Sequence, residues 1–261
     1  MFFNGKNHHL LEQAILDGLD INEQDEKGDT IFHNNNHINN LILAVEHGFN
    51  VNTQNKYGNT IFHIGHHLDN LPLINGINFN LQNDDGETIF HNGTHTNYLP
   101  LAIEKGFNIN LQDYNGNTIF HIGKHKNYLP LAIEKGFNIN LQNRYGYTIF
   151  HLGRHITLLP LAIEKGFNIN LQNIYGYTIF HLCDNLNNLP LVIEKGFNIN
   201  SRDADGNTIF HNNQKQTVLP FAIENGFDIN LQNEKGQTIL HHLENPKEFL
   251  KILCEYFSKI D

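Results

Sequence analysis

The chain repeats itself at a nearly constant interval of thirty residues. Residues 116–145 read GNTIFHIGKHKNYLPLAIEKGFNINLQNRY, and a close copy follows at once. Alignment on the opening Gly-x-Thr-Ile-Phe-His, with Leu240 in place of Phe in the last copy, places the starts at Gly28, Gly58, Gly86, Gly116, Gly146, Gly176, Gly206 and Gly236. A fixed period in this range predicts a stacked repeat protein.

The residues of one copy predict its local structure. Gly116 suits a turn that needs a positive φ, and Thr118 suits the N-cap of a short helix. Residues 128–133 predict a second helix, because their apolar side chains recur at helical spacing and their proline lies near the start, where a missing N–H costs little. Gly136 ends this helix as a left-handed residue. Residues 137–145 then read as an extended arm and a tight turn.

Two segments of the copy resemble the ankyrin repeat. The opening at 116–121 is similar to the family's Gly-x-Thr-Pro-Leu-His, and the close at 132–140 is similar to Leu-Leu-x-x-Gly-Ala-x-x-Asn. Isoleucine replaces the family's proline in every copy, and the period is thirty residues instead of about 33. The missing residues fall before the second helix, so we expect the first helix to be little more than one turn. The resemblance implies an all-α, ankyrin-type helical solenoid with short inner helices and hairpin tips.

Capping units are expected at both ends of the array. Residues 1–27 match a second helix and a closing arm, which predicts an N-terminal capping unit. Residues 28–235 hold seven ankyrin-like repeats, and the second helix of repeat two is shortened by two residues. Residues 236–261 lack the closing arm and end in a helix with Lys and Glu on one face, as expected for a polar C-terminal capping repeat.

Composition argues against several classes of protein. The net charge of -10 argues against a nucleic-acid binder and favours a basic protein partner. No segment approaches the ~18 apolar residues of a membrane span, and the first residues lack the apolar core of a signal peptide. We therefore expect a cytoplasmic chain with no membrane partner. Cys183 and Cys254 belong to no metal-type cluster, so both are expected to be buried.

Histidine is the first candidate for a functional site. The opening histidine has a second histidine four residues later in five copies: His33 with His37, His63 with His67, His91 with His95, His121 with His125, and His151 with His155. Such a pair on a helix can hold zinc. A structural role is favoured, because no third ligand recurs and the second column changes to Asn185, Lys215 and Asn245. The ankyrin resemblance implies that the opening histidine hydrogen-bonds to the neighbouring repeat, and we expect neither metal nor cofactor.

An enzyme is not expected. A column of glutamates recurs at the end of the second helix, in Glu104, Glu134, Glu164, Glu194 and Glu224. Charges at this place ordinarily lie on the solvated back and serve solubility. A catalytic site gathers unlike groups in one place, whereas repetition sets like groups in rows. The sequence therefore predicts no catalytic residue.

The turn tips vary most between copies, and they are the candidates for partner binding. In ankyrin proteins the tips and the concave face dock partners, so the resemblance implies the same surface here. The predicted partner-binding residues are Tyr114, Arg144, Tyr145, Tyr147, Ile174, Tyr175 and Tyr177, with Asp84 and Asp85 in an acidic flank and Asp203, Asp205 and Glu234 in another. Tyrosine and arginine are enriched at interface hot spots. The alternative is that the tyrosines only pack on one another along the row of tips.

The sequence thus predicts a non-enzymatic, monomeric protein-binding module that works as a scaffold or by occlusion. For a partner that is a toxin or an enzyme, the same binding makes the chain an inhibitor or an immunity protein. Two alternatives stay open. One is a secreted effector that binds a host protein through the same surface, and the other is a metal-binding protein that uses the histidine columns.

Overall fold

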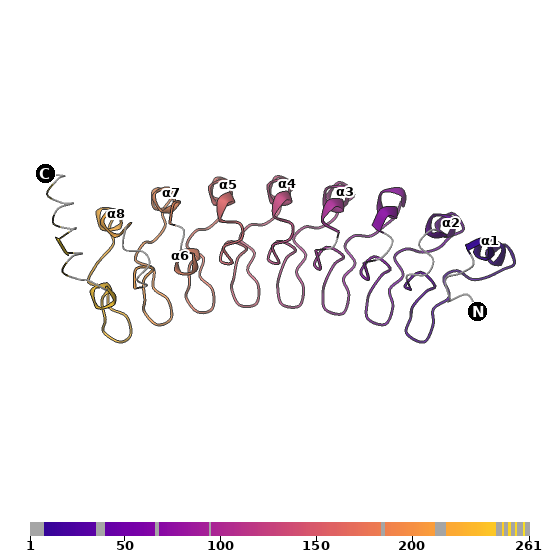
Figure 1. The fold of residues 1–261 in the computed structure, drawn as a ribbon, viewed down its shortest axis with the longest axis horizontal. Helices are drawn as coiled ribbons and strands as arrows, with labels where there is room; N and C mark the ends of the chain where they lie inside the picture. The colour runs from indigo at the N-terminus through magenta and orange to yellow at the C-terminus, as the bar shows by residue number, and fades with distance from the viewer. Residues whose placement is uncertain are drawn as a thin grey trace. The chain divides into compact units, whose positions relative to one another are not determined.

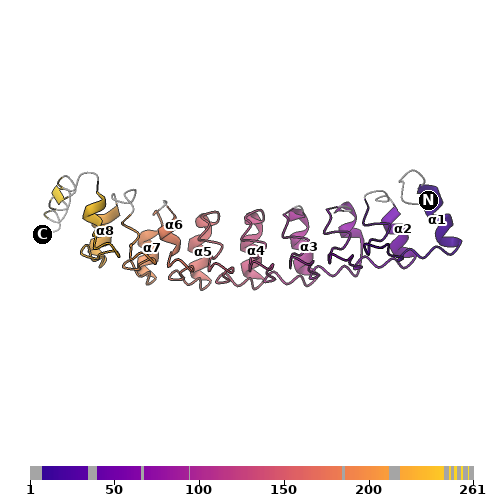
Figure 2. The same cartoon turned by 90° about the horizontal axis from the view of Figure 1, so that it is seen from below.

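The computed structural model describes residues 8–34, 40–65, 68–93, 95–183, 186–211 and 218–243, and residues 247, 250, 251, 254 and 258. The chain forms two compact units, Met1–Phe137 and Asn138–Asp261. Within each unit the copies follow one another in sequence order, with the second helices in one row and the turn tips in another (Figures 1 and 2). The described residues form helices and turns, and an isolated bridge joins Arg202 to Thr208.

Short helices alternate with turns in both units, where η marks a 3-10 helix. The first unit contains α1 (His8–Leu16), α2 (Leu41–Glu46), η2 (Leu68–Leu73), η3 (Thr96–Tyr98), α3 (Leu99–Glu104), η4 (Lys126–Tyr128) and α4 (Leu129–Glu134). The second contains η5 (Ile156–Leu158), α5 (Leu159–Glu164), α6 (Ile179–Leu182), α7 (Leu189–Glu194), α8 (Leu219–Glu224) and η7 (Ile239–His242). None of these helices is both long and apolar enough to cross a membrane.

The second helix of the regular copies begins and ends close to where its sequence predicts. In α5 the proline occupies one of the first two positions, where its missing N–H leaves no intrahelical bond unmade. Gly166 follows with a φ of 90°, so it accepts the left-handed conformation that closes the helix. In repeat two the shortened segment forms only the 3-10 helix η2, as its missing residues predict.

The first helix is reduced to a turn in most copies, as predicted. Only α6, with four residues, is an α-helix, and η7 is a single 3-10 turn. Thr178 opens α6 with a capping box: its side chain accepts from the backbone of His181, and the His181 ring accepts from the backbone of Thr178. The same Thr–His pair closes the turn in the other copies, so three to four residues suffice to hold the opening phenylalanine in place.

The core consists of one thin apolar layer in each copy. The opening phenylalanine is fully buried, and it packs on the phenylalanine of the closing arm; in the central copy the rings of Phe150 and Phe167 lie 4.6 Å apart. Leu159 and Ala162 of α5 complete the layer with no exposed surface. Burial of one such phenylalanine contributes roughly 1.5–3 kcal/mol. Each layer is too small to stand alone, so stability depends on stacking.

The tips are tight loops closed on themselves, and within each unit neighbouring tips are joined by backbone hydrogen bonds. Oδ1 of Asn143 accepts from the backbone N–H of Tyr145 at 3.0 Å and of Tyr147 at 3.1 Å. Gly146, at the apex, has a φ of 76°. The backbone N–H of Ile174 in the next tip donates to the Tyr145 carbonyl at 3.1 Å. The tips therefore form a backbone-bonded row.

Two sequence predictions concern the cysteines and the division of the chain. Cys183 is buried as predicted, but the prediction for Cys254 is wrong, because this residue is exposed. The division into capping unit 1–27, repeats 28–235 and capping repeat 236–261 stays a prediction, and much of the last helix lies outside the described residues.

The close approach of neighbouring tips predicts unequal effects for two glycine substitutions. Both Gly146 and Gly166 have positive φ, but a Cβ on Gly146 would lie 2.7 Å from Cα of Asn173, whereas a Cβ on Gly166 meets nothing within 4 Å. Gly166→Ala should cost about 1 kcal/mol of unfolding free energy from backbone strain alone. Gly146→Ala should cost at least about 1 kcal/mol more from the clash. Urea unfolding checks this, and equal losses would contradict the stacking of the tips.

Candidate functional site

The opening histidines are structural bridges between copies. The Nδ1 atom of His151 accepts from the Thr148 backbone N–H at 3.0 Å, and its Nε2–H donates to the Tyr177 carbonyl of the next copy at 2.9 Å. His33, His63, His91, His181 and His211 make the same contact with the carbonyls of Asn59, Glu87, Asn117, Asn207 and Gln237. The predicted hydrogen bond to the neighbouring repeat is therefore confirmed, and it requires a neutral ring.

The second histidine column binds backward along the chain. Nε2 of His95 donates to the Phe62 carbonyl at 2.8 Å, and Nε2 of His125 donates to the Phe90 carbonyl at 2.7 Å. The predicted positions His37, His67, Asn185, Lys215 and Asn245 lie outside the described residues. Across the described ranges, no three His, Cys, Asp or Glu side chains form a group that could hold a metal ion.

Burial keeps these rings uncharged. Desolvation lowers the pKa of His63 to about 4, well below its ordinary value near 6.5. The same cause lowers the pKa of His91, His95, His125, His151 and His211. A protonated ring could no longer accept the threonine N–H, so neutral histidine is part of the fold.

Side-chain amides provide a second set of bridges that the sequence analysis missed. Nδ2 of Asn170 donates to the Gly196 carbonyl at 3.0 Å, while its Oδ1 accepts from the Asn198 N–H at 2.8 Å. Gln142 spans its own turn and the next copy, donating to the carbonyls of Gly146 at 2.6 Å and Gln172 at 2.9 Å. The strict recurrence of these amides in an exposed arm was the available signal. The glutamate column is exposed, as predicted.

The candidate tip surface lies in the second unit and comprises Arg144, Tyr145, Tyr147, Ile174, Tyr175 and Tyr177. Ile174 is 60% exposed, Tyr175 47% and Tyr145 38%, whereas Tyr147 and Tyr177 are partly buried. The Arg144 guanidinium lies 4.7 Å from the Tyr145 ring centroid and donates to its hydroxyl. Large apolar and aromatic side chains thus stand in solvent on adjacent tips.

The tyrosines pack partly on one another and partly on histidines. The rings of Tyr175 and Tyr177 lie 6.1 Å apart, while Tyr147 lies 5.9 Å from His151 and Tyr177 lies 5.9 Å from His181. Tyr145 instead stacks beneath an arginine. Mutual packing therefore describes one pair, and it does not account for the row as a whole.

The remaining predicted residues occupy neighbouring tips of the first unit. Asp84, Asp85 and Tyr114 are exposed, and Tyr114 is 75% exposed. The Tyr114 N–H donates to the Asp85 carbonyl at 3.0 Å, and the Asp84 N–H donates to the Tyr57 carbonyl at 3.0 Å. The first unit therefore brings an acidic pair next to an exposed tyrosine.

Side-chain bonds also join three pairs of neighbouring tips, in each of which an asparagine faces a carboxylate or amide oxygen. Nδ2 of Asn55 donates to Asp29 Oδ1 at 2.8 Å. The same bond links Asn83 to Asn59 at 3.1 Å and Asn233 to Asn207 at 3.0 Å. An asparagine at the base of one tip is therefore satisfied by a carboxylate or amide oxygen in the tip before it.

Tyr147 breaks this pattern. It occupies the position of Asp29, Asn59 and Asn207. Unlike them, its side chain has no carboxylate or amide oxygen close to the backbone. The facing Asn173 is only 6% exposed, and its Nδ2 is buried without a hydrogen-bond partner among the described residues. A buried amide left in this state costs roughly 1–3 kcal/mol. The tyrosine at this position therefore lacks the stabilising bond that asparagine or aspartate makes in three other copies.

The neutral histidines predict acid sensitivity. Because the folded-state pKa of His63 is lowered, the unfolded chain binds more protons below pH 6.5, and stability falls as pH drops from 6.5 toward the folded value of about 4. Thermal or urea unfolding should show full stability above pH 7, with His63 alone accounting for about 2 kcal/mol lost at pH 5.

His63→Gln should reduce the loss between pH 7 and pH 5, even though it lowers stability at pH 7. The exposed His47 is the matched control, and His47→Gln should keep the full loss. An unchanged pH dependence in the His63 variant would contradict the assignment of a neutral bridging ring.

The unpaired amide predicts a stabilising substitution. Tyr147→Asn supplies the missing oxygen to Asn173 and should raise the unfolding free energy by about 1 kcal/mol. The control is Tyr177→Asn, because the facing residue there is Asp203, which has no amide to satisfy. Urea denaturation of both variants checks this; a gain in the control as large as in the test variant would show that tyrosine itself, and not the unpaired amide, lowers stability.

No family model matches the sequence, and no curated protein matches it. Among solved structures, the chain is similar to the ankyrin repeat domain of Bcl-3, described as a unique member of the IkappaB protein family. The two share 20% sequence identity and superpose with a TM-score of 0.50, over 66% of this chain and 86% of that chain. The likeness confirms the predicted all-α solenoid, and the chain thus has the ankyrin-repeat fold.

Proposed function

We propose that the chain is a non-enzymatic protein-binding module whose tip surface docks a basic protein. The observation that carries the proposal is the buried, unpaired Nδ2 of Asn173 opposite Tyr147. Three other copies place a carboxylate or amide oxygen at this position and satisfy the facing amide, so pairing with that amide favours asparagine or aspartate over tyrosine. A buried polar group left without a partner calls for an explanation, and residues that lower stability are common at functional sites.

Exposure of the neighbouring side chains supports the same surface. Ile174 and Tyr175 project from one tip with 60% and 47% of their surfaces in solvent. Arg144 and Tyr145 provide a second anchor on the tip before it, already held together by their own contact. Arginine and tyrosine contribute most to binding when a partner covers them and excludes water.

Charge supports a basic partner. The net charge is -10, and Asp203, Asp205 and Glu234 continue the row of tips beyond Tyr177 in the second unit. In the first unit Asp84 and Asp85 provide a second acidic site beside Tyr114. Acidic groups around an aromatic patch raise the association rate with a positively charged protein and suppress binding of acidic ones.

The surface is formed before binding, which favours tight docking. The Ile174 N–H binds the Tyr145 carbonyl, and the Ala204 N–H binds the Tyr175 carbonyl at 2.9 Å, so consecutive tips share one backbone network. A preformed surface loses little conformational entropy when a partner binds. In this proposal the chain acts by occlusion, and it is an inhibitor or immunity protein when the partner is an enzyme or a toxin.

The test variant changes the tip surface to residues that the fold already accepts. It combines Tyr145→Asn, Tyr147→Asn, Tyr175→Asn and Tyr177→Asn, because Asn115 and Asn117 occupy the equivalent positions of another copy. The control combines Glu164→Gln and Lys165→Gln at the exposed end of α5. All three proteins are used in affinity capture from a lysate of the source organism, and the captured protein is then purified for titration at two salt concentrations.

The native chain and the control should capture the same basic protein, and the tyrosine variant should bind it at least about a hundredfold more weakly. Its affinity for the native chain should fall as salt rises, because exposed charges steer the association. Capture of the same proteins by the native chain and the tyrosine variant would overturn the proposal.

A further inference from the structure

A cavity of about 500 Å³ opens in the second unit beside the tip surface. Three consecutive copies line it: Tyr177 and Leu182 come from one, Asp203 and His211 from the next tip and turn, and His242 from the last copy. Leu182 and Ile209 add aliphatic surface to the lining, next to these polar groups. A cavity of this size accommodates a side chain with part of its backbone.

In the described part of the chain, the groups that donate hydrogen bonds to the Asp203 carboxylate are all uncharged. Its Oδ1 accepts from the N–H groups of Asp205 at 2.9 Å and Asn207 at 2.8 Å, and its Oδ2 accepts from the Asn207 amide at 3.3 Å. A carboxylate offers about four acceptor sites, so Oδ2 retains capacity for another donor.

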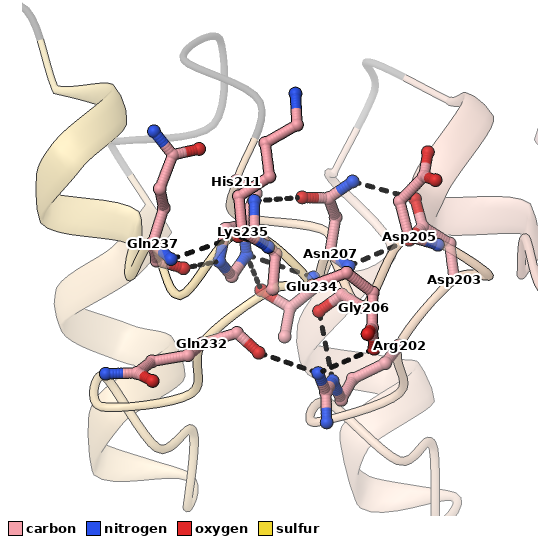
Figure 3. A network of polar contacts seen from close by, with 12 residues as sticks. Arg202, Asp203, Asp205, Gly206, Asn207, His211, Gln232, Glu234, Lys235 and Gln237 are labelled. Carbon is pink, nitrogen blue, oxygen red and sulfur yellow. Dashed lines mark hydrogen bonds and ion pairs between the residues drawn. The ribbon is translucent and has the colours of Figure 1, made fainter.

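The adjacent Arg202 is directed elsewhere. It replaces the glutamine of the other copies, and its guanidinium donates to the carbonyls of Gly206 at 3.0 Å and Gln232 at 2.6 Å (Figure 3). Its remaining ionic contact is with Glu234 at 3.8 Å. The guanidinium thus serves the turn and the neighbouring copy, and the negative charge of Asp203 stays available to the cavity.

A second acceptor comes from the last copy. Nε2 of His242 is buried and has no hydrogen-bond partner among the described residues, and the ring lies 5.5 Å from that of His211. His211 is different, because its nitrogens bind the Thr208 N–H and the Gln237 carbonyl. The position of His242 carries isoleucine or leucine in several copies, for example Leu182, so the fold does not require a histidine there.

Tyr177 adds an aromatic wall within the field of the carboxylates. Burial raises the pKa of its hydroxyl, and the charges of Asp203 and Asp205 raise it further. The phenol therefore stays neutral at physiological pH, and the ring can receive a cation on its face. The cavity combines a carboxylate, an imidazole nitrogen and a neutral aromatic ring.

We propose that this cavity binds an arginine side chain of the protein partner. A guanidinium presents five N–H donors in one plane, so it can reach the Asp203 carboxylate and His242 Nε2 together while it stacks on Tyr177. A lysine ammonium is a compact point charge and matches this spread of acceptors less well. The inference rests on the proposed function, because the partner docked on the tip surface is what supplies the arginine.

The test uses short blocked peptides and the full chain. Acetyl-Gly-Arg-Gly-amide, and its lysine and glutamate counterparts, are titrated while NMR follows the ring signals of His211 and His242. The arginine peptide should bind with a dissociation constant of about 1 mM, as expected for a single side chain. The lysine peptide should bind at least about threefold more weakly, and the glutamate peptide should leave both signals unmoved.

Asp203→Asn removes the charge and keeps the turn, since Asn173 makes the same bonds to Tyr175 N–H and Tyr177 N–H at 3.0 and 2.9 Å. This substitution should raise the dissociation constant of the arginine peptide about tenfold. The matched control is Asp113→Asn: Asp113 accepts the same three bonds in its own turn, and its removal should leave binding unchanged. His242→Leu, which copies a residue found at this position elsewhere, should also weaken binding.

Equal binding of the three peptides would overturn the inference, as would equal effects of the two aspartate variants or no binding up to about 10 mM peptide. Failure of the cavity is distinguishable from failure of the tip surface. A variant with Tyr145→Asn, Tyr147→Asn and Tyr175→Asn leaves the cavity wall intact, so it should bind the arginine peptide as the native chain does. If the native chain captures a partner that the tyrosine variant does not, and yet no arginine peptide binds, only the cavity inference is wrong.

Discussion

The structure depends on side chains of one copy satisfying backbone groups of the next. A helix such as α4 has six residues, far below the ~12 at which an isolated helix becomes even marginally stable in water. Most of the remaining backbone lies in turns, whose carbonyl and N–H groups have no helix or sheet ladder. Histidine, asparagine and glutamine at fixed positions bind these groups across the boundary between copies, so many backbone groups of the turns are paired in consequence. Apolar layers alone would not fix the alignment of one copy on another.

This constraint limits where binding residues can lie. Most positions of a copy serve either the apolar layer or the bridges, and a change at such a position affects two copies at once. The residues around the tip glycine are largely exempt, because the backbone of the tip is bonded by its own Asx turn and by the next tip. Tyr147 shows the limit of that freedom: where it stands, the buried Nδ2 of Asn173, one copy away, has no hydrogen-bond partner among the described residues. Binding specificity and stacking thus compete at the edge of the tip.

Much of the fold could be predicted from the sequence because its causes are local. The period, the helix-ending glycine exemplified by Gly166 and the opening histidine each act within one copy or its neighbour, and all three appear in the structure as predicted. The asparagine and glutamine bridges were missed, because amide side chains in an exposed arm leave no apolar periodicity. Cys254 was wrongly predicted to be buried, since residue type alone does not determine which face of a helix is covered. The unpaired amide of Asn173 could not be predicted, because it depends on which residues of neighbouring tips face each other in the folded chain.

Repetition disfavours a site made of unlike groups, because it sets equal groups in rows. In the second unit, unlike groups occur where the copies differ in sequence. Tyrosine replaces asparagine at Tyr177, arginine replaces glutamine at Arg202, and histidine replaces an aliphatic residue at His242. Each of these substitutions is compatible with stacking, and Arg202 even reproduces the two carbonyl bonds of the glutamine that it replaces. Because neighbouring copies stack closely, two of these changes, Tyr177 and His242, line one cavity with Asp203, while Arg202 binds the backbone of its own turn and of the next copy. In an array of near-identical units, a run of divergent positions is therefore the place where different chemical groups come together.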